Sequence, residues 1–174
     1  VSGQALLGGH PTAVRVWGQG ARQLLALHCS LAHAGAWSGV ATQLGGVTFS
    51  APDLPGHGRS ADWDGAEDLH LVATRMALAL AERIGGPVDL LGHSFGGTIA
   101  LRLALERPDL VRSLTFDLGE KGYYSDFQAD GQWQLTPGQP ARGVWRPAAD
   151  KASLTYRVRI SHSRKNGSFD TRMT

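Results

Sequence analysis

The chain has 174 residues, a formal net charge of +2 and 42% hydrophobic residues, a balance typical of a soluble domain with its own core. The charge is too small to indicate a nucleic-acid-binding protein, and no apolar stretch is long enough for a transmembrane helix. The first residues do not have the basic start and apolar run of a secretion signal. The single cysteine, Cys29, excludes an internal disulfide. We therefore expect a cytoplasmic protein that binds neither nucleic acid nor membrane.

The first third of the chain alternates between strand and helix signals. Residues 13–19 and 23–29 predict successive strands that a glycine-containing turn separates. Residues 34–46 indicate a short helix, and residues 46–56 a strand that runs into a Pro/Gly loop.

The strongest helix signal covers residues 66–84. Apolar side chains there recur every three or four positions, the spacing of one buried helix face: Leu69, Val72, Met76, Leu80 and Ile84. Asp64 and Glu67 have the spacing of a helix-capping pair at its start.

A short apolar strand over 87–93, an apolar helix over 96–107 and a strand over 111–117 complete the alternation. Strands that alternate with helices favour a parallel sheet with helices on its faces. The sequence therefore predicts the α/β class for residues 1–117.

Residues 118–174 differ in character and predict a β-rich or partly disordered tail. Residues 1–117 carry eight arginines and ten acidic residues, whereas residues 118–174 carry nine basic and five acidic residues, including all three lysines. Residues 153–162 alternate between apolar and polar side chains, as a half-buried antiparallel strand does. An Asn-Gly pair follows and signals a hairpin. We expect a domain boundary near residue 117.

Residues 92–96 read Gly-His-Ser-Phe-Gly and match the pattern G-x-S-x-G. A buried strand precedes this pattern and an apolar helix follows it, the context of a sharp turn that holds a nucleophilic serine, Ser94. Gly92 and Gly96 would remove side chains that clash at such a turn. The N–H of Phe95 would point to the same place at a helix N-terminus and stabilise an oxyanion.

Two further stretches strengthen a resemblance to the α/β-hydrolase superfamily in its esterase and lipase branch. Residues 53–60, DLPGHGRS, resemble the family's loop after its fourth strand, and residues 25–37, LALHCSLAHAGAW, resemble the loop after its third strand. The resemblance covers residues 12–117 and implies the N-terminal half of an α/β-hydrolase core. The departure is Cys29, which stands where the family usually has glycine.

The resemblance also implies roles for residues around Ser94. It implies an oxyanion hole formed by the N–H of Phe95 together with that of Ser30 or Leu31. His28 and His57 match histidines that hold the family's loops by hydrogen bonds, and His93 matches a variable packing position of the turn.

An acid and a base must accompany a serine nucleophile, in the chain order Ser, Asp or Glu, then His. Asp117 ends the predicted strand 111–117 and is the candidate acid. His162 is the one histidine after Ser94 and is the candidate base, although it resembles a surface residue at a strand end. No metal site and no cofactor are predicted.

The tail does not resemble the family's C-terminal half. We expect the N-terminal half of a hydrolase joined to foreign sequence, whose tail faintly resembles the N-terminal β-domain of glycyl-aminopeptidase-like metallopeptidases. The predicted function is a serine hydrolase for a small ester or related acyl substrate, impaired by a missing acid and base. The alternatives are an inactive fragment or chimera and an interaction module with a basic tail. An exposed edge on the strand 111–117 predicts self-association.

Overall fold

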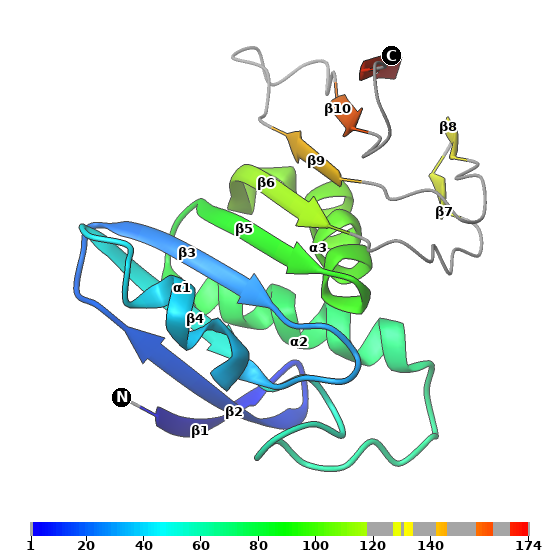
Figure 1. Ribbon diagram of the computed structural model, residues 1–174. Coiled ribbons are helices and arrows are strands. Elements are labelled where there is room, and N and C mark those ends of the chain that lie inside the picture. The colour runs from blue at the N-terminus through cyan, green and yellow to red at the C-terminus, as the bar shows by residue number, and fades with distance from the viewer. Residues whose placement is uncertain are drawn as a thin grey trace.

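The computed structural model describes residues 2–117 and five strand segments beyond them, 127–129, 131–133, 142–145, 156–161 and 168–173. The sheet strands are, in chain order, β1 (Ser2–Leu7), β2 (His10–Trp17), β3 (Arg22–Leu27), β4 (Val47–Pro52), β5 (Val88–His93), β6 (Val111–Asp117) and β9 (Arg142–Trp145). They form one seven-stranded sheet in the order β1-β2-β4-β3-β5-β6-β9, which Figure 1 shows with β1 at the blue end.

The centre of this sheet is parallel. Strands β4, β3, β5 and β6 run in the same direction, whereas β1, β2 and β9 pair antiparallel with their neighbours. The carboxyl ends of the parallel strands therefore meet at one edge, which we call the carboxyl edge. The predicted α/β class and parallel core are confirmed.

Helices cover both faces of the sheet (Figure 1). The long helices α2 (Leu69–Ile84) and α3 (Phe95–Glu106) pack on one face, where Leu25 and Leu27 of β3 join the main core. The short helices η1 (Ala34–Trp37) and α1 (Ser38–Ala41) pack on the other face against a smaller cluster that includes Ala26 and Phe49. Because successive residues of a strand point to opposite faces, β3 contributes to both clusters.

Helix α2 begins at Leu69, three residues later than its sequence pattern indicated, and its predicted cap is wrong. The carboxylate of Asp68 accepts a hydrogen bond from the N–H of Leu71 at 3.1 Å and caps the helix. Asp64 instead accepts from the N–H of Ala66 in the preceding loop. Of the five residues of the predicted buried face, Val72, Met76 and Leu80 are buried and the other two are partly buried.

Strand β9 changes the prediction made for β6. It pairs antiparallel with β6, from Leu114 opposite Trp145 to Asp117 opposite Arg142. The prediction of an open edge on β6 is therefore wrong, although self-association and a boundary near residue 117 stay predictions.

The hairpin predicted in the tail is confirmed, because β10 (Tyr156–Ser161) pairs antiparallel with β11 (Ser168–Met173). The short strands β7 (Phe127–Ala129) and β8 (Gly131–Trp133) pair with each other.

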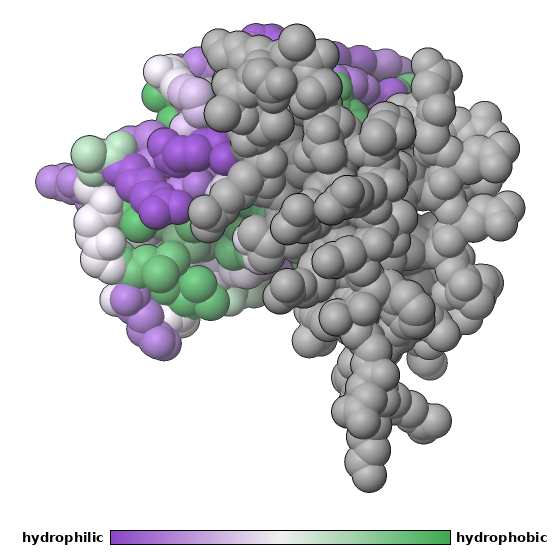
Figure 2. All heavy atoms as spheres, turned by 90° about the horizontal axis from the view of Figure 1, so that it is seen from above, coloured by the Kyte–Doolittle hydropathy of each residue, from purple (hydrophilic) through white to green (hydrophobic). Residues whose placement is uncertain are grey.

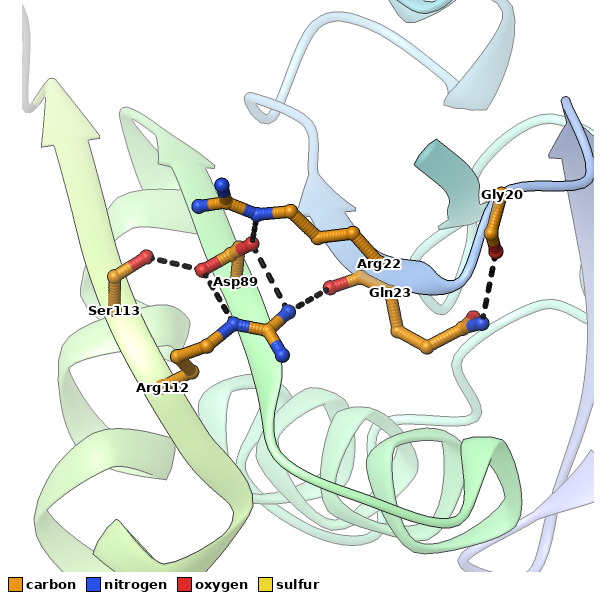
Figure 3. Close-up of polar contacts among 6 residues, drawn as sticks. All are labelled: Gly20, Arg22, Gln23, Asp89, Arg112 and Ser113. Carbon is orange, nitrogen blue, oxygen red and sulfur yellow. Dashed lines mark hydrogen bonds and ion pairs between the residues drawn. The ribbon is translucent and has the colours of Figure 1, made fainter. Parts of the chain in front are cut away.

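A buried carboxylate joins the three adjacent strands β3, β5 and β6 near their amino ends (Figure 3). Arg112 donates to the two carboxylate oxygens of Asp89 at 3.1 and 3.0 Å, Ser113 donates to one of them at 2.6 Å, and Arg22 donates from the opposite side. Burial raises the pKa of Asp89, but the hydrogen bonds from Arg22, Arg112 and Ser113 more than offset it and hold the pKa below its ordinary value.

The surface of the described residues mixes hydrophilic and hydrophobic side chains, and Figure 2 shows both kinds side by side when the molecule is seen from above. The large hydrophobic side chains that remain exposed are Leu6, Leu31, Val40, Leu44, Trp63 and Leu71. Among the described residues, no helix is long and apolar enough to cross a membrane.

Candidate functional site

Ser94 occupies the turn between β5 and α3 with φ 51° and ψ −117°. It is the only non-glycine residue with a positive φ in the part of the chain that the structure describes. A side chain in such a conformation carries strain of about 1–3 kcal/mol, which the surrounding structure must offset. The predicted strand–turn–helix context of Ser94 is confirmed.

Gly92 and Gly96 make this turn sterically possible. A Cβ atom on Gly92 would lie 2.6 Å from the carbonyl oxygen of Gly96, because β5 runs directly under the first turn of α3. A Cβ atom on Gly96 would lie 2.2 Å from the carbonyl oxygen of Leu27, at the end of β3. The two glycines therefore set how closely α3 approaches β5 and β3, as their positions in the motif predict.

The N-terminus of α3 offers unused main-chain donors beside Ser94. The carbonyl oxygen of Ser94 accepts from the N–H groups of Gly97 and Thr98 at 2.8 and 3.2 Å. Within the described residues, neither the N–H of Phe95 nor the hydroxyl of Ser94 makes a hydrogen bond. A free N–H at a helix N-terminus is suited to bind a negatively charged oxygen.

The loop after β3 forms a β-turn next to this point. The N–H of Ala32 donates to the carbonyl oxygen of Cys29 at 3.1 Å, which leaves Ser30 and Leu31 at the two central positions. Both are exposed, and the side chain of Leu31 is almost entirely so, at 98%. The N–H groups of Ser30 and Leu31 donate to no other described residue. Cys29 is partly buried and takes part in the turn through its backbone.

His28 fastens this loop to the loop after β4. Its Nε2 accepts from the N–H of Leu54 at 2.9 Å, so its Nδ1 carries the proton and donates to the carbonyl oxygen of Cys29 at 2.8 Å. Burial, in the first place, lowers the pKa of His28 to about 4, although the hydrogen bond to Cys29 opposes it. His28 is therefore a neutral histidine with both nitrogens engaged.

The loop after β4 is organised around Asp53, a residue whose role the sequence did not reveal. The buried carboxylate accepts from the N–H of Ala34 at 2.7 Å and from the N–H of Arg59 at 2.9 Å. A Cβ atom on Gly58 would lie 2.3 Å from this carboxylate, so the loop closes tightly around it. The position of Asp53 directly after a buried strand could have indicated this role, because a buried carboxylate needs hydrogen-bond donors from nearby main chain.

His57 links the same loop to the β-turn. Its Nδ1 lies 2.8 Å from the carbonyl oxygen of Pro55, and its Nε2 lies 2.8 Å from the carbonyl oxygen of Ser30. The ring also stands edge-on to that of His28, with the centroids 5.2 Å apart.

Strand register brings three of these segments to the carboxyl edge. Leu27 of β3 and Phe116 of β6 both pair with Gly92 of β5. Asp117 pairs with His93, the residue before Ser94, so its backbone lies beside the turn. His93 is exposed, and His162 lies outside the described residues.

Comparison with known proteins identifies the family. A family model described as the alpha/beta hydrolase family matches residues 24–170, which is more than half of the chain. The chain belongs to the alpha/beta hydrolase family. The matched region extends past residue 117 into the tail.

This alpha/beta hydrolase is similar to Lipase LipV of Mycobacterium tuberculosis, with 38% identity over 95 residues, 55% of this chain and 36% of the relative. It is also similar to the pimeloyl-[acyl-carrier protein] methyl ester esterase of Nitrosomonas europaea, with 37% identity over 92 residues, 52% of this chain and 34% of the relative. The matches thus span about a third of the length of these two curated relatives.

Solved structures agree with the fold of this alpha/beta hydrolase. E-2-(acetamidomethylene)succinate hydrolase aligns with a TM-score of 0.61 and 26% identity, over 66% of this chain and 42% of the other. An epoxide hydrolase from Vigna radiata aligns with a TM-score of 0.59 over 67% of this chain and 39% of the other, and at 22% identity this likeness shows the fold alone.

A further histidine of the alpha/beta hydrolase, His70 of α2, contacts the first turn of α3, which directly follows Ser94. The hydroxyl of Thr98 donates to the carbonyl oxygen of Phe95 at 2.7 Å and contacts Nε2 of His70 at 3.1 Å. The rings of His70 and Phe95 meet edge to face, with centroids 5.9 Å apart. Burial, followed by the positive charge of Arg102, lowers the pKa of His70. The sequence pattern of α2 did not distinguish this residue from a surface histidine.

Proposed function

We propose that this α/β-hydrolase is a serine hydrolase that acts on a small ester or related acyl substrate, with Ser94 as nucleophile. The observation that carries the proposal is the strained backbone of Ser94 next to the free N–H of Phe95. Enzymes of acyl transfer hold main-chain donors where the oxyanion of the tetrahedral intermediate forms. The names of the relatives, a lipase and a methyl ester esterase, support an ester as substrate.

In the proposed reaction, the hydroxyl oxygen of Ser94 attacks the ester carbonyl carbon and gives its proton to a base. The carbonyl oxygen becomes negative and accepts hydrogen bonds from Phe95 N–H and from Ser30 or Leu31 N–H. The alcohol then leaves with the proton, and water hydrolyses the acyl-enzyme in the same manner.

The acid and base of this reaction are proposed as Asp117 and His162. Asp117 ends β6 with its backbone beside His93, so it reaches the carboxyl edge near Ser94. His28 and His57 do not suit the role of base, because both ring nitrogens of each contact main-chain atoms. His162 is the one histidine that follows Ser94 in the chain order of the family.

The competing proposal is that the chain is catalytically impaired or inactive and binds an acyl group without turning it over. The observation that favours it is the lack of a hydrogen bond from the Ser94 hydroxyl to any histidine among the described residues. Loss of triad residues lowers the rate by on the order of 10⁴–10⁶.

One experiment separates the two proposals. The full chain and its Ser94→Ala variant are treated with a fluorophosphonate probe, and p-nitrophenol release from p-nitrophenyl acetate is followed in parallel. Stoichiometric labelling that maps to Ser94 by peptide mass, with a burst equal to the protein concentration, supports the serine hydrolase. If the folded unsubstituted chain and the folded Ser94→Ala variant show the same labelling and the same p-nitrophenol release, the inactive form is supported.

A further inference from the structure

A histidine of α2 reaches across to the helix that directly follows Ser94, and the two helices lie side by side on one face of the sheet (Figure 1). Nε2 of His70 lies 3.1 Å from the hydroxyl oxygen of Thr98 in α3. The same hydroxyl donates to the carbonyl oxygen of Phe95 at 2.7 Å. A carbonyl oxygen only accepts, so this contact uses the single hydroxyl proton of Thr98. Nε2 of His70 must therefore carry a proton and donate it to Thr98.

The other ring nitrogen of His70 faces its own helix. Nδ1 lies 3.4 Å from the hydroxyl oxygen of Thr74, which is one turn further along α2 and buried. With the proton on Nε2, a neutral ring leaves Nδ1 as an acceptor, so the hydroxyl of Thr74 donates to it. The hydrogen bonds therefore run in one direction, from α2 through the imidazole to the carbonyl of Phe95.

The surroundings of His70 favour this neutral ring. Burial, in the first place, lowers its pKa, and the positive charge of Arg102 on α3 acts in the same direction. Asp68 on α2, the contact with Thr98 and Glu106 on α3 oppose this change without cancelling it. A neutral imidazole has one donor and one acceptor, which is what the two threonine hydroxyls require.

His70 holds Phe95 at two separate points. It reaches the carbonyl of Phe95 through Thr98, and its ring meets the ring of Phe95 edge to face, with the centroids 5.9 Å apart and the planes at 79°. The N–H groups of the first helical turn have no partner within the helix, so this turn is held less firmly than the helix interior. The two contacts therefore restrain the residue that carries the free N–H beside Ser94.

The first turn of α3 needs such a restraint because it has no side-chain cap. The side chain of the N-cap residue ordinarily fixes a helix N-terminus, as the carboxylate of Asp68 does for α2. Ser94 is the N-cap of α3, and its hydroxyl makes no capping bond in the part of the chain that the structure describes. A nucleophilic hydroxyl must stay available to the substrate, so another residue has to fix this turn.

We infer that His70 is a positioning residue: through Thr98 and through its own ring it fixes Phe95, whose free N–H is the proposed oxyanion donor. The inference rests on the proposed function for its effect on the reaction rate. Removal of a whole oxyanion donor lowers the rate of acyl-transfer enzymes by about 10²–10³. A donor that is only displaced should cost less, about 3-fold to 30-fold.

Four substitutions separate the contacts of His70. His70→Phe keeps an edge-to-face ring and loses the donor, whereas His70→Gln keeps a nitrogen donor and loses the ring. Thr98→Val removes the hydroxyl with little change of shape, and Thr98→Ser keeps it. Thr42→Val is the matched control, because the hydroxyl of Thr42 also donates to carbonyl oxygens one turn earlier, those of Ser38 at 2.9 Å and Gly39 at 3.3 Å, on the opposite face of the sheet.

The first measurement is independent of catalysis and uses NMR of the folded full chain at pH 7. The imidazole ¹⁵N signals of His70 should show the proton on Nε2, and the Nε2 signal should move in Thr98→Val. The three-bond HN–Hα coupling of Phe95, which reports its backbone angle φ, should change in His70→Phe and Thr98→Val and stay the same in Thr98→Ser and Thr42→Val. A proton on Nδ1, or a coupling that Thr98→Val leaves unchanged, would overturn the inference.

The second measurement is the rate at which fluorophosphonate labels Ser94. We expect His70→Phe and Thr98→Val each to label about 3-fold to 30-fold more slowly, and Thr98→Ser and Thr42→Val to stay within about two-fold of the unsubstituted chain. His70→Gln should label faster than His70→Phe, because it keeps the donor to Thr98. The opposite order would overturn the role of the hydrogen bond.

A double variant tests whether His70 acts through Thr98. If both belong to one chain of hydrogen bonds, His70→Phe combined with Thr98→Val should label no more slowly than the slower single variant. Effects that multiply in the double variant would overturn the inference. If His70→Phe does not fold, the comparison of Thr98→Val with Thr98→Ser makes the same test. If the unsubstituted chain is not labelled, the proposed function fails, and the NMR comparison alone decides whether His70 fixes Phe95.

Discussion

Gly96 and Leu27 approach so closely that a Cβ atom on the glycine would lie 2.2 Å from the carbonyl oxygen of the leucine. The obstacle is main chain, not the end of a flexible side chain, so an alanine must displace either β3 or α3. We expect Gly96→Ala to lower the free energy of unfolding by about 1–3 kcal/mol and to slow labelling of Ser94.

The matched control is Gly39→Ala, because no atom lies within 4 Å of a Cβ at that helical glycine. We expect it to leave stability unchanged or slightly raised. Urea unfolding of both variants measures the difference, and a Gly96→Ala protein as stable as Gly39→Ala would contradict the prediction.

The backbone of Ser94 predicts a conflict between stability and chemistry. With φ 51° and ψ −117°, this residue holds a conformation that glycine adopts without strain. We expect the free energy of unfolding of Ser94→Gly to exceed that of Ser94→Ala by about 1 kcal/mol, so that Ser94→Gly melts at a higher temperature. Neither variant should react with fluorophosphonate. Thermal melts of the two variants check this, and equal melting temperatures would show that the turn stores no strain.

The stability of the fold is expected to fall in mild acid. The pKa of His28 is lowered from 6.5 to about 4 in the folded chain, so between these values the unfolded chain binds a proton that the folded chain does not. Stability is therefore lost as the pH falls from 6.5 toward 4, by at most about 3 kcal/mol. His70, whose pKa is also lowered, acts in the same direction.

Urea unfolding at pH 7, 6, 5 and 4.5 measures this loss. In His28→Gln the amide keeps an acceptor for the N–H of Leu54 without a group that titrates, so the slope should be smaller. A slope that His28→Gln leaves unchanged would place the acid sensitivity elsewhere.

Asp89 is expected to stabilise the three central strands. Its replacement by asparagine leaves Arg22 and Arg112 without a negative partner and weakens four hydrogen bonds from three side chains. We expect Asp89→Asn to lower the free energy of unfolding by about 1–3 kcal/mol. Asp62→Asn, at an exposed position, should change it little, and urea unfolding at pH 7 compares the two. Equal effects would contradict a role for the buried carboxylate.

Deletion of residues 118–174 is expected to destabilise β6. The deletion removes β9 and leaves the main-chain groups of β6 open, and open edges promote association. We expect sedimentation velocity to show oligomers of the shortened chain and a lower melting temperature. A shortened chain that stays monomeric with the same melting temperature would show that β9 contributes nothing to the sheet.

Local patterns predicted the central elements because each carries its own signal. The face of α2 follows from apolar spacing, and the turn at Ser94 follows from two glycines between a strand and a helix. The start of α2 was predicted three residues too early because Asp64 and Glu67 have the spacing of a capping pair. In the structure the indole N–H of Trp63 donates to the carbonyl oxygen of Glu67, and the Glu67 carboxylate binds Arg75, so this segment stays outside the helix.

Contacts between distant segments could not be predicted in the same way. Strand β1 has two successive leucines, of which Leu6 is exposed and Leu7 is buried, so its apolar and polar residues do not alternate along the sequence. Strand β9 has four residues, one of them glycine, and is defined only by its pairing with β6. Ser30, which His57 contacts through Nε2, and the partners of Asp89 lie more than 20 residues away in the chain. The sequence around His57 and Asp89 does not indicate those partners.

The antiparallel pairing of β9 has a consequence for redesign of the chain. Because Asp117 and Arg142 are register partners, the chain leaves the sheet and re-enters it at neighbouring points on the same rim, the rim on which Ser94 lies. A shorter or longer connector between these two points leaves the strand order of the sheet unchanged. The interval 118–141 is thus a candidate insertion site, because a connector of another length between Asp117 and Arg142 leaves the pairing of β6 with β9 unchanged.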